Sequence, residues 1–216
     1  MKLYYVPGAC SLSPHIVLNE LGDDFSLVKV DYKTHTTQDG GDFFARNPFG
    51  YVPLLELEDG TRLREGPAIV QYLADRKPAL GLAPANGSLA RYRLQEWLNF
   101  LSTEIHKGFI PLLYAVLAGK YATESAKPKL AHRFAWIDEQ LAERAYLMGD
   151  TYTVADAYLF ALTQWGQASW LDSVYKADIH FDDLTHLQRW YARVRERPAV
   201  RKALADEGLK VTTRAA

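Results

Sequence analysis

The single cysteine of this 216-residue chain, Cys10, stands where a thiol can be reactive. It follows a short apolar run and a Pro-Gly turn, and it precedes a predicted helix. Free N–H groups and the dipole at a helix N-terminus stabilise a thiolate, which lowers a cysteine pKa from about 8.5. The alternative is that Cys10 is a small buried hydrophobic residue, as many free cysteines are. If the helix begins only after Ser13, the dipole acts on Cys10 less strongly.

Two other short segments carry groups that suit ligand binding. Val52-Pro53 comes just before a predicted strand, and an X–Pro bond can be cis. Glu65-Gly66-Pro67 stands at the start of a predicted helix, where backbone N–H groups favour a carboxylate or a phosphate. Each segment, taken alone, is equally consistent with a plain turn.

A row of polar side chains lies within a long predicted helix. Asn99, Thr103 and His106 are spaced four and three residues apart, which places them on one helix face. Such a face is either the solvated side of an amphipathic helix or a row of hydrogen-bonding groups directed at a cleft. The spacing alone leaves both interpretations open.

The charge balance argues against a polyanionic partner. The chain has 25 basic and 26 acidic residues, so its formal net charge is −1. A protein so close to neutrality has no overall field that attracts nucleic acid or anionic lipid. We therefore expect no nucleic-acid partner.

The composition excludes several other classes. With 48% apolar and 24% charged residues, the chain is typical of globular proteins rather than disordered ones. One cysteine excludes an internal disulfide or a cysteine zinc ribbon, and the segment His180–His186 lacks zinc-ligand spacing, so we expect no metal. No apolar run reaches the about 18 residues of a membrane span, and the segment before Pro7 is too short for a secretory signal. We expect no membrane contact and a cytoplasmic location.

The first 80 residues predict an α/β unit in the order β-α-β-α-β-β-α. Gly22 is placed to end the first helix, Asp59-Gly60 to turn a hairpin, and Pro67 to begin the last helix. The predicted strands are 3–6, 25–30, 54–57 and 61–64, with helices at 16–21 and from 66 onward.

Beyond residue 80 the strand signals disappear. A Gly- and Pro-rich linker, 81–87, leads into long segments with apolar residues at three- and four-residue spacing. We predict two domains, 1–80 and 87–216, and the second is all-helical with frayed residues 211–216. Its predicted helices are 88–118, 124–145, 153–170 and 184–203.

Six stretches between Met1 and about Lys210 together carry a family resemblance. They are KLYYVPGACSLS (2–13), NPFGYVP (47–53), EGPAIVQYLAD (65–75), EWLN (96–99), EIHKGF (104–109) and TVADAYLF (153–160). With these stretches the chain resembles the cytosolic glutathione S-transferases, most closely the bacterial beta class. The resemblance implies a thioredoxin-like N-terminal domain, an all-helical C-terminal domain, a cis Pro53 and a homodimer.

The resemblance also assigns roles in the N-terminal half. Cys10 is similar to the class's residue beside the glutathione thiol, and Val52 to the residue whose backbone pairs with the cysteinyl part. Glu65 and Gly66 correspond to the residues that hold the γ-glutamyl end, although many relatives have serine in place of Gly66. His35 stands where relatives often have a lysine for the glycyl carboxylate, and a neutral histidine supplies no full charge. We expect weaker glutathione affinity for that reason.

In the helical half, the resemblance places His106 near the sulfur, where it assists catalysis by bonding to the thiol or helping to deprotonate it. Asn99 and Glu104 are implied as further glutathione contacts, with Glu104 reaching across the dimer. Thr153 and Asp156 have the spacing of a helix capping box, which we interpret as structural.

The resemblance implies a glutathione transferase that conjugates glutathione, its co-substrate, to hydrophobic electrophiles in detoxification. Phe109, Tyr114 and Trp165 are candidates for the acceptor pocket. Peroxidase or thiol–disulfide exchange activity through Cys10 is a variant of this reading. The alternatives are a non-catalytic glutathione-binding or interaction protein with the same fold, and a maleyl-type isomerase, whose Ser-Ser-Cys signature is absent.

Overall fold

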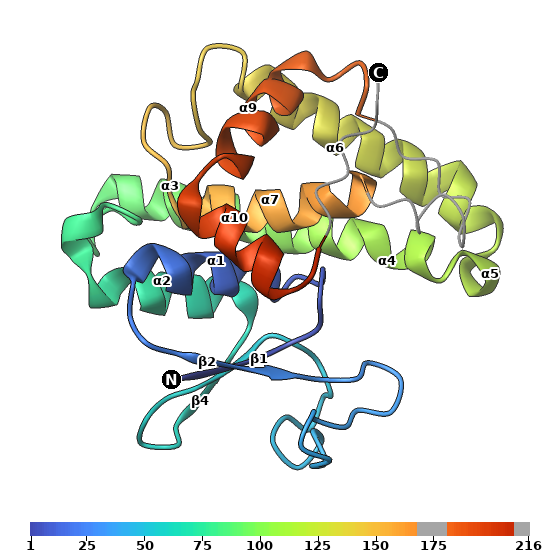
Figure 1. Cartoon of the computed structure of the whole chain (residues 1–216). Coiled ribbons are helices and arrows are strands. Elements are labelled where there is room, and N and C mark those ends of the chain that lie inside the picture. Colours follow the sequence, from blue (N-terminus) through green and yellow to red (C-terminus); the bar gives the residue numbers. More distant parts are fainter. Residues whose placement is uncertain (168–180, 210–216) are drawn as a thin grey trace.

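The N-terminal part is built on a four-stranded mixed sheet, seen in a computed structural model that describes residues 1–167 and 181–209 (Figure 1). The strands lie in the order β2-β1-β3-β4, with β1 parallel to β2 and antiparallel to β3, and β3 antiparallel to β4. They are β1 (Lys2–Tyr5), β2 (Ser26–Lys29), β3 (Leu54–Glu56) and β4 (Arg62–Arg64). All four predicted strands are therefore confirmed.

The alternation of side chains along β1 explains how both faces of the sheet are covered. Leu3 and Tyr5 point into the main core, whereas Tyr4 belongs to a second, smaller apolar cluster with Val30 and Phe43. Successive residues of a strand face opposite sides, so one short strand supplies both clusters. The central strand is consequently buried from Leu3 to Tyr5.

Helices α1 (Leu12–Leu21) and α2 (Gly66–Arg76) lie between the sheet and the C-terminal helices (Figure 1). Gly22 ends α1 in the left-handed conformation, with φ 67°, as predicted. The helix expected between the second and third strands is absent, and residues 30–53 form turns and isolated bridges instead. Two adjacent glycines and two prolines in this segment oppose helix formation.

The rest of the described chain is helical. The elements are α3 (Leu89–Phe100), η2 (Leu101–His106), α4 (Lys107–Leu113), α5 (Ala115–Ala118), η3 (Ala122–Ala126), α6 (Lys127–Gln140), α7 (Val154–Gln167), α9 (Thr185–Arg195) and α10 (Pro198–Asp206), after a short 3₁₀ turn η1 (Pro78–Leu80). Of these, η2 and η3 are π-helical turns. None of the helices in the described ranges is long and apolar enough to cross a bilayer.

Three of the predicted helices differ in the structure. The predicted helix 124–145 begins within the π-helical turn η3, and its α-helical part ends at Gln140. The segment 88–118 contains the π-helical turn η2 and a break at Tyr114, and 184–203 divides at Arg197 because Pro198 begins a new helix. The predicted helix 153–170 is confirmed to residue 167, while residues 168–170 and the predicted frayed end lie outside the described residues.

The capping box at the start of α7 is more extensive than predicted. Asp156 accepts from the Thr153 N–H at 2.9 Å, as expected, but the Thr153 hydroxyl donates to the same carboxylate instead of accepting from its amide. The Leu147 N–H and the Trp190 indole also donate to Asp156, each at 2.9 Å. This buried carboxylate therefore joins three segments of the helical part.

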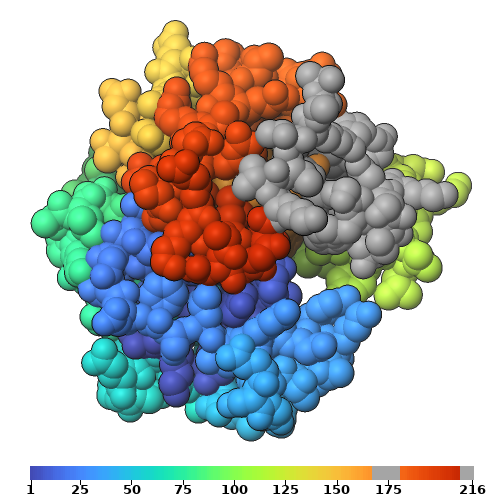
Figure 2. All heavy atoms as spheres, in the orientation of Figure 1, coloured from blue at the N-terminus to red at the C-terminus, as the bar shows by residue number. Residues whose placement is uncertain are grey.

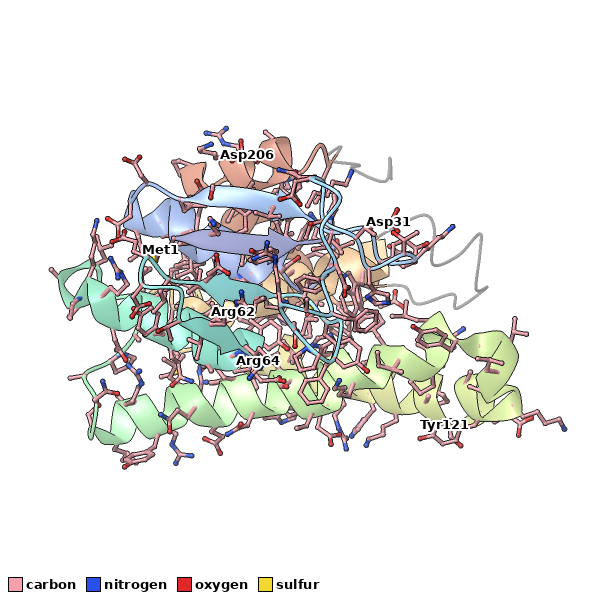
Figure 3. All side chains as sticks on the ribbon, turned by 90° about the horizontal axis from the view of Figure 1, so that it is seen from below. Met1, Asp31, Arg62, Arg64, Tyr121 and Asp206 are labelled. Atoms are coloured by element: carbon pink, nitrogen blue, oxygen red, sulfur yellow. The ribbon has the colours of Figure 1, made fainter. Side chains whose placement is uncertain are left out.

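Helix α10 packs against α1, so the last helix of the described residues lies on the N-terminal part (Figures 1 and 2). The Arg197 guanidinium donates to both Glu20 oxygens, at 2.7 and 3.1 Å. In Figure 3, Asp206 of α10 and the arginines Arg62 and Arg64 of β4 lie toward opposite edges of the sheet. The helix α10 is thus placed on the β2 side, with its first turn beside the end of α1.

Candidate active site

Cys10 lies one residue before the cap of α1. The helix begins at Leu12 with Ser11 as its N-cap, so the sequence alternative of a start after Ser13 is wrong. Only 8% of Cys10 is exposed, and its thiol donates to the Val52 carbonyl oxygen at 3.4 Å. The thiol therefore sits between the start of α1 and the Val52-Pro53 turn.

Burial raises the pKa of the Cys10 thiol to about 12. The N–H groups of Cys10 and Ser11 and the charge of Lys107 act in the opposite direction, while Glu65 raises the pKa further. The predicted lowering by the helix N-terminus is wrong because desolvation of the thiolate outweighs these contributions. At neutral pH this thiol is protonated and acts as a hydrogen-bond donor.

The Val52–Pro53 peptide bond is cis, as the resemblance implied. Val52 is half-buried, and its carbonyl accepts from the Cys10 thiol. Within the described part of the chain, the Val52 N–H has no hydrogen-bond partner. A free backbone donor next to an acceptor suits pairing with an extended peptide.

Glu65 holds an unusual backbone conformation at the start of α2. Its φ is 67° and ψ is 115°, outside the ordinary regions for a residue with a side chain. Among the described residues its exposed carboxylate has no ion pair or hydrogen bond, and Gly66 behind it is buried. Strain of this kind costs about 1–3 kcal/mol and is concentrated at functional sites.

His106 is brought to the same region by the π-helical turn η2. It is half-buried, and its Nδ1 lies 2.8 Å from the Tyr158 hydroxyl, with the Trp165 ring 5.1 Å away between centroids. Burial, followed by the charge of Lys107, lowers the pKa of His106 to about 4. The imidazole is neutral at physiological pH, so it can accept or donate but adds no positive charge.

Tyr158 is a site residue that the sequence did not reveal. Its hydroxyl bonds to His106 and Ser102, and its ring lies 4.0 Å from where a Cβ on Gly66 would stand. Burial and the nearby Cys10 raise the pKa of Tyr158 well above its usual value. Because it belongs to an apolar run of α7, the pattern indicated only a core residue.

The predicted row Asn99, Thr103 and His106 does not share one environment. Asn99 and Thr103 are exposed, and the Thr103 hydroxyl donates to the Asn99 carbonyl at 3.0 Å. His106 alone turns inward, because a π-helical turn has more residues per turn than the α-helix that the spacing assumed. The prediction of a single face is wrong, and the ligand role of Asn99 stays a prediction.

Glu104 is engaged within its own chain. Its carboxylate pairs with Arg133 at 2.9 Å and Lys129 at 3.1 Å, both on α6. These bonds hold the pKa of Glu104 below its usual value. Its predicted contact across a dimer stays a prediction.

His35 lies in the loop between β2 and β3. It is half-buried with φ 54°, and its Nδ1 is buried with no partner among the described residues. Its ring packs on Phe44 at 4.4 Å between centroids, and a Cβ on Gly50 would come within 2.8 Å of Nδ1. This packing therefore requires glycine at position 50.

Two of the three acceptor-pocket candidates are core residues. Phe109 is fully buried and Trp165 is 6% exposed, whereas Tyr114 is 58% exposed. Figure 2 shows a hollow between the light-blue loop after β2 and the yellow-green helices α4 and α5, which are the elements next to Tyr114. A groove of about 700 Å³ lies elsewhere, between α3 and α6, with Trp97, Phe100 and Trp136 in its lining.

Residues 1–167 and 181–209 contain no group of three or more side chains arranged to hold a metal ion. His180 of the segment considered above lies outside the described residues.

Two family models match the chain. The model for the glutathione S-transferase N-terminal domain matches residues 8–76, and that for the C-terminal domain matches 100–198. Glutathione S-transferase GstA of Escherichia coli O157:H7 is 42% identical over 210 residues, which are 97% of this chain and 100% of that protein.

Solved structures give the same picture. A sphingomonad glutathione S-transferase complexed with glutathione is 42% identical, with a TM-score of 0.89, over 97% of this chain and 100% of that one. A bacterial beta class enzyme from Sphingomonas chungbukensis is 39% identical with a TM-score of 0.86, again over 97% and 100%.

Proposed function

This chain belongs to the glutathione S-transferase family, and we propose that it joins the sulfur of glutathione to electrophilic small molecules. The observation that carries the proposal is the arrangement around Cys10. The Cys10 thiol contacts the Val52 carbonyl, and the charge of Glu65, which precedes the buried Gly66 at the start of α2, acts on the same thiol. Neither the Glu65 carboxylate nor the Val52 N–H has a partner among the described residues. This set provides partners for the amino, carboxylate and amide groups of a γ-linked tripeptide.

Each of these groups has a proposed partner on glutathione. The Glu65 carboxylate binds the γ-glutamyl ammonium, and the N–H at Gly66, at the positive end of α2, binds the γ-glutamyl carboxylate. Val52, the residue before the cis Pro53, pairs through its backbone with the cysteinyl residue of glutathione. His35 contacts the glycyl carboxylate, and Asn99 and Glu104 contribute from the helical half.

The proposed chemistry uses the protonated state of Cys10. The glutathione thiol gives up its proton to water, and its thiolate accepts hydrogen bonds from N–H groups at the start of α1 and from the Cys10 S–H, which turns to it from the Val52 carbonyl. The thiolate sulfur then attacks an electrophilic carbon, so that a C–S bond forms while a leaving group such as halide departs with its electron pair. Neutral His106, held by Tyr158, is a hydrogen-bonding partner for the sulfur rather than a cation.

Conjugation is favoured over reactions in which Cys10 itself attacks. A thiol whose pKa is about 12 supplies little thiolate at neutral pH, and the thiolate is the nucleophile in disulfide exchange and peroxide reduction. A non-catalytic interaction protein that binds no glutathione is disfavoured, because it has no need for the strained Glu65, whose carboxylate has no partner in residues 1–167 and 181–209. A non-catalytic glutathione-binding protein would keep the same Glu65, so the turnover assay decides for or against it.

We further propose a homodimer whose chain divides into domains at 1–80 and 87–216. Two apolar surfaces are available for self-association. One is formed by the exposed side chains of Phe49 and Tyr51 on the N-terminal part, and the other is the groove beside Trp97 and Trp136. Sedimentation equilibrium tests the dimer.

A cytoplasmic location fits the single, unpaired cysteine, and cell fractionation tests it.

The proposed function is tested by turnover with glutathione and a chloronitrobenzene, measured as release of chloride and formation of the thioether. We expect saturable turnover in glutathione, reduced at least about tenfold in Glu65→Gln because a charged hydrogen bond is lost. Glu58→Gln, at an exposed position of the hairpin, is the matched control and keeps full activity. Glutathione binding without turnover of any electrophile would support the non-catalytic alternative.

A further inference from the structure

Glu207 is a buried carboxylate to which the proposed reaction gives no role. It directly follows α10, and its side chain has no solvent exposure. Burying a carboxylate is costly unless its oxygens find donors, and a buried ion pair is weak evidence for stability. Its specific contacts therefore suggest what else it does.

The two oxygens of Glu207 reach two different parts of the N-terminal half. One accepts from the Gly8 N–H at 2.8 Å, in the loop that leads to Cys10. The other lies 2.9 Å from Nδ1 of His15, a fully buried residue of α1, whose second ring nitrogen is 3.5 Å from Asp206. Glu207 thus connects the end of α10 with both the loop and the helix that flank Cys10.

Gly8 is held on its other side as well. Its carbonyl accepts from the Trp165 indole N–H at 2.8 Å. Its φ is +73°, and a Cβ there would touch the Leu209 side chain at 3.4 Å. Two residues of the C-terminal half, Glu207 and Trp165, therefore fix the backbone two residues before Cys10.

The other end of α10 provides an internal comparison. Arg197 forms its two hydrogen bonds with Glu20 near the end of α1, and Glu20 is also largely buried. This ion pair joins the same two helices, which Figure 1 shows packed together, without contacting the loop at Gly8. Loss of Glu20 separates a general effect on helix docking from an effect on the loop.

We propose that Glu207 is a positioning residue that holds the Gly8 backbone from the end of α10 and so sets the place of the Cys10 thiol opposite Val52. The inference rests on the proposed function, because it takes Cys10 to lie in the glutathione site. Without the carboxylate, the Gly8 N–H loses its partner and the loop no longer holds the thiol against the Val52 carbonyl. Glutathione then binds less well, and Cys10 becomes more accessible.

The test compares Glu207→Ala and Glu207→Gln with the control Glu20→Gln. Four quantities are measured for each folded variant: the KM for glutathione, the KM for the electrophile, the rate of Cys10 alkylation by iodoacetamide without glutathione, and the melting temperature. Glutamine has one acceptor oxygen for two donors, so Glu207→Gln is expected to lie between the parent and Glu207→Ala.

We expect Glu207→Ala to raise the KM for glutathione and the alkylation rate about tenfold each, the factor that corresponds to one lost charged hydrogen bond. The KM for the electrophile stays within about twofold, since the acceptor side is unchanged. Glu20→Gln lowers the melting temperature and leaves the glutathione KM and the alkylation rate at parental values.

The proposal is overturned if both Glu207 variants only lower the melting temperature, as the control does, with alkylation and glutathione KM unchanged. Alkylation of Cys10 needs no glutathione, so this arm remains decisive even if the parent enzyme fails to bind the tripeptide. A parent that does not bind glutathione contradicts the proposed function, whereas an unchanged alkylation rate contradicts the role of Glu207.

Discussion

The buried thiol of Cys10 gives a sharp expectation for its reactivity with pH. A pKa of about 12 in place of the ordinary 9.0 lowers the thiolate fraction at neutral pH by about a thousandfold. Only the thiolate attacks iodoacetamide, so the alkylation rate falls by the same factor relative to an exposed thiol, and the 8% exposure of the residue slows it further.

The assay is intact-mass measurement of alkylation between about pH 6 and pH 10, with the urea-unfolded chain as reference. Cys10 is the only cysteine, so every adduct reports this site, and Cys10→Ser must give none. In the folded protein the alkylation rate should rise about tenfold per pH unit without levelling off, because every pH of the assay lies below the pKa of the thiol. In the unfolded chain the rate should level off near pH 9.

A rate that levels off below about pH 9 in the folded protein would refute the reasoning. It would mean that the N–H groups at the start of α1 and the charge of Lys107 outweigh desolvation. Cys10 would then be a thiolate at neutral pH, and thiol–disulfide exchange would replace hydrogen-bond donation as its role.

Three further predictions concern other residues of the site and its support. Gly66→Ser is expected to tighten glutathione binding about two- to tenfold, because the new hydroxyl adds one hydrogen bond. The side chain has room there, since a Cβ at position 66 stands 4.0 Å from the Tyr158 ring. Weaker binding of glutathione in calorimetry would contradict this prediction. His106→Asn should lower kcat about a hundredfold. In the parent, the plot of kcat/KM against pH should show no inflection from this imidazole between about pH 5.5 and pH 8, since the pKa of His106 is about 4. An inflection in that range that disappears in His106→Asn would contradict the neutral state of His106. Asp156→Asn should lower the melting temperature by about 6–12 °C, from about 3 kcal/mol of lost bonding to buried donors, with kcat per folded molecule unchanged. Burial raises the pKa of Asp156 to about 6, so the folded state binds this proton more tightly than the unfolded state. The contribution of Asp156 to stability should therefore decrease as pH rises from about 4 to about 6. Melting temperatures measured across that range should show this decrease in the parent, and the decrease should be absent in Asp156→Asn.

The turn-forming and helix-ending residues of the N-terminal half are sufficient to predict its strands. Gly22 and the Asp59-Gly60 turn act locally, through positive φ and hairpin geometry, so their effects are readable from neighbouring residues alone. The missing helix between β2 and β3 shows the limit. That segment takes its shape from packing on Tyr4 through Phe43, which is a contact between distant residues.

The site itself was only partly predictable for the same reason. The family motif identified Cys10, Val52 and Glu65, and the structure brings Cys10 and Val52 into contact. The thiol's pKa depends on burial by elements far along the chain, which no local dipole argument includes. Tyr158 contacts His106 from α7, and Glu207 contacts Gly8, two residues before Cys10, from the end of α10. The sequence around each of them indicates only ordinary helical positions.

The most direct test of the account is a calorimetric titration of the protein with glutathione, in the parent and in Glu65→Gln. The account predicts saturable binding with one tripeptide per chain, and an affinity at least about tenfold weaker in the variant, because the γ-glutamyl ammonium loses its anionic partner. Glu58→Gln should bind as the parent does. No saturation at millimolar glutathione, or equal affinity in the parent and Glu65→Gln, would contradict the account.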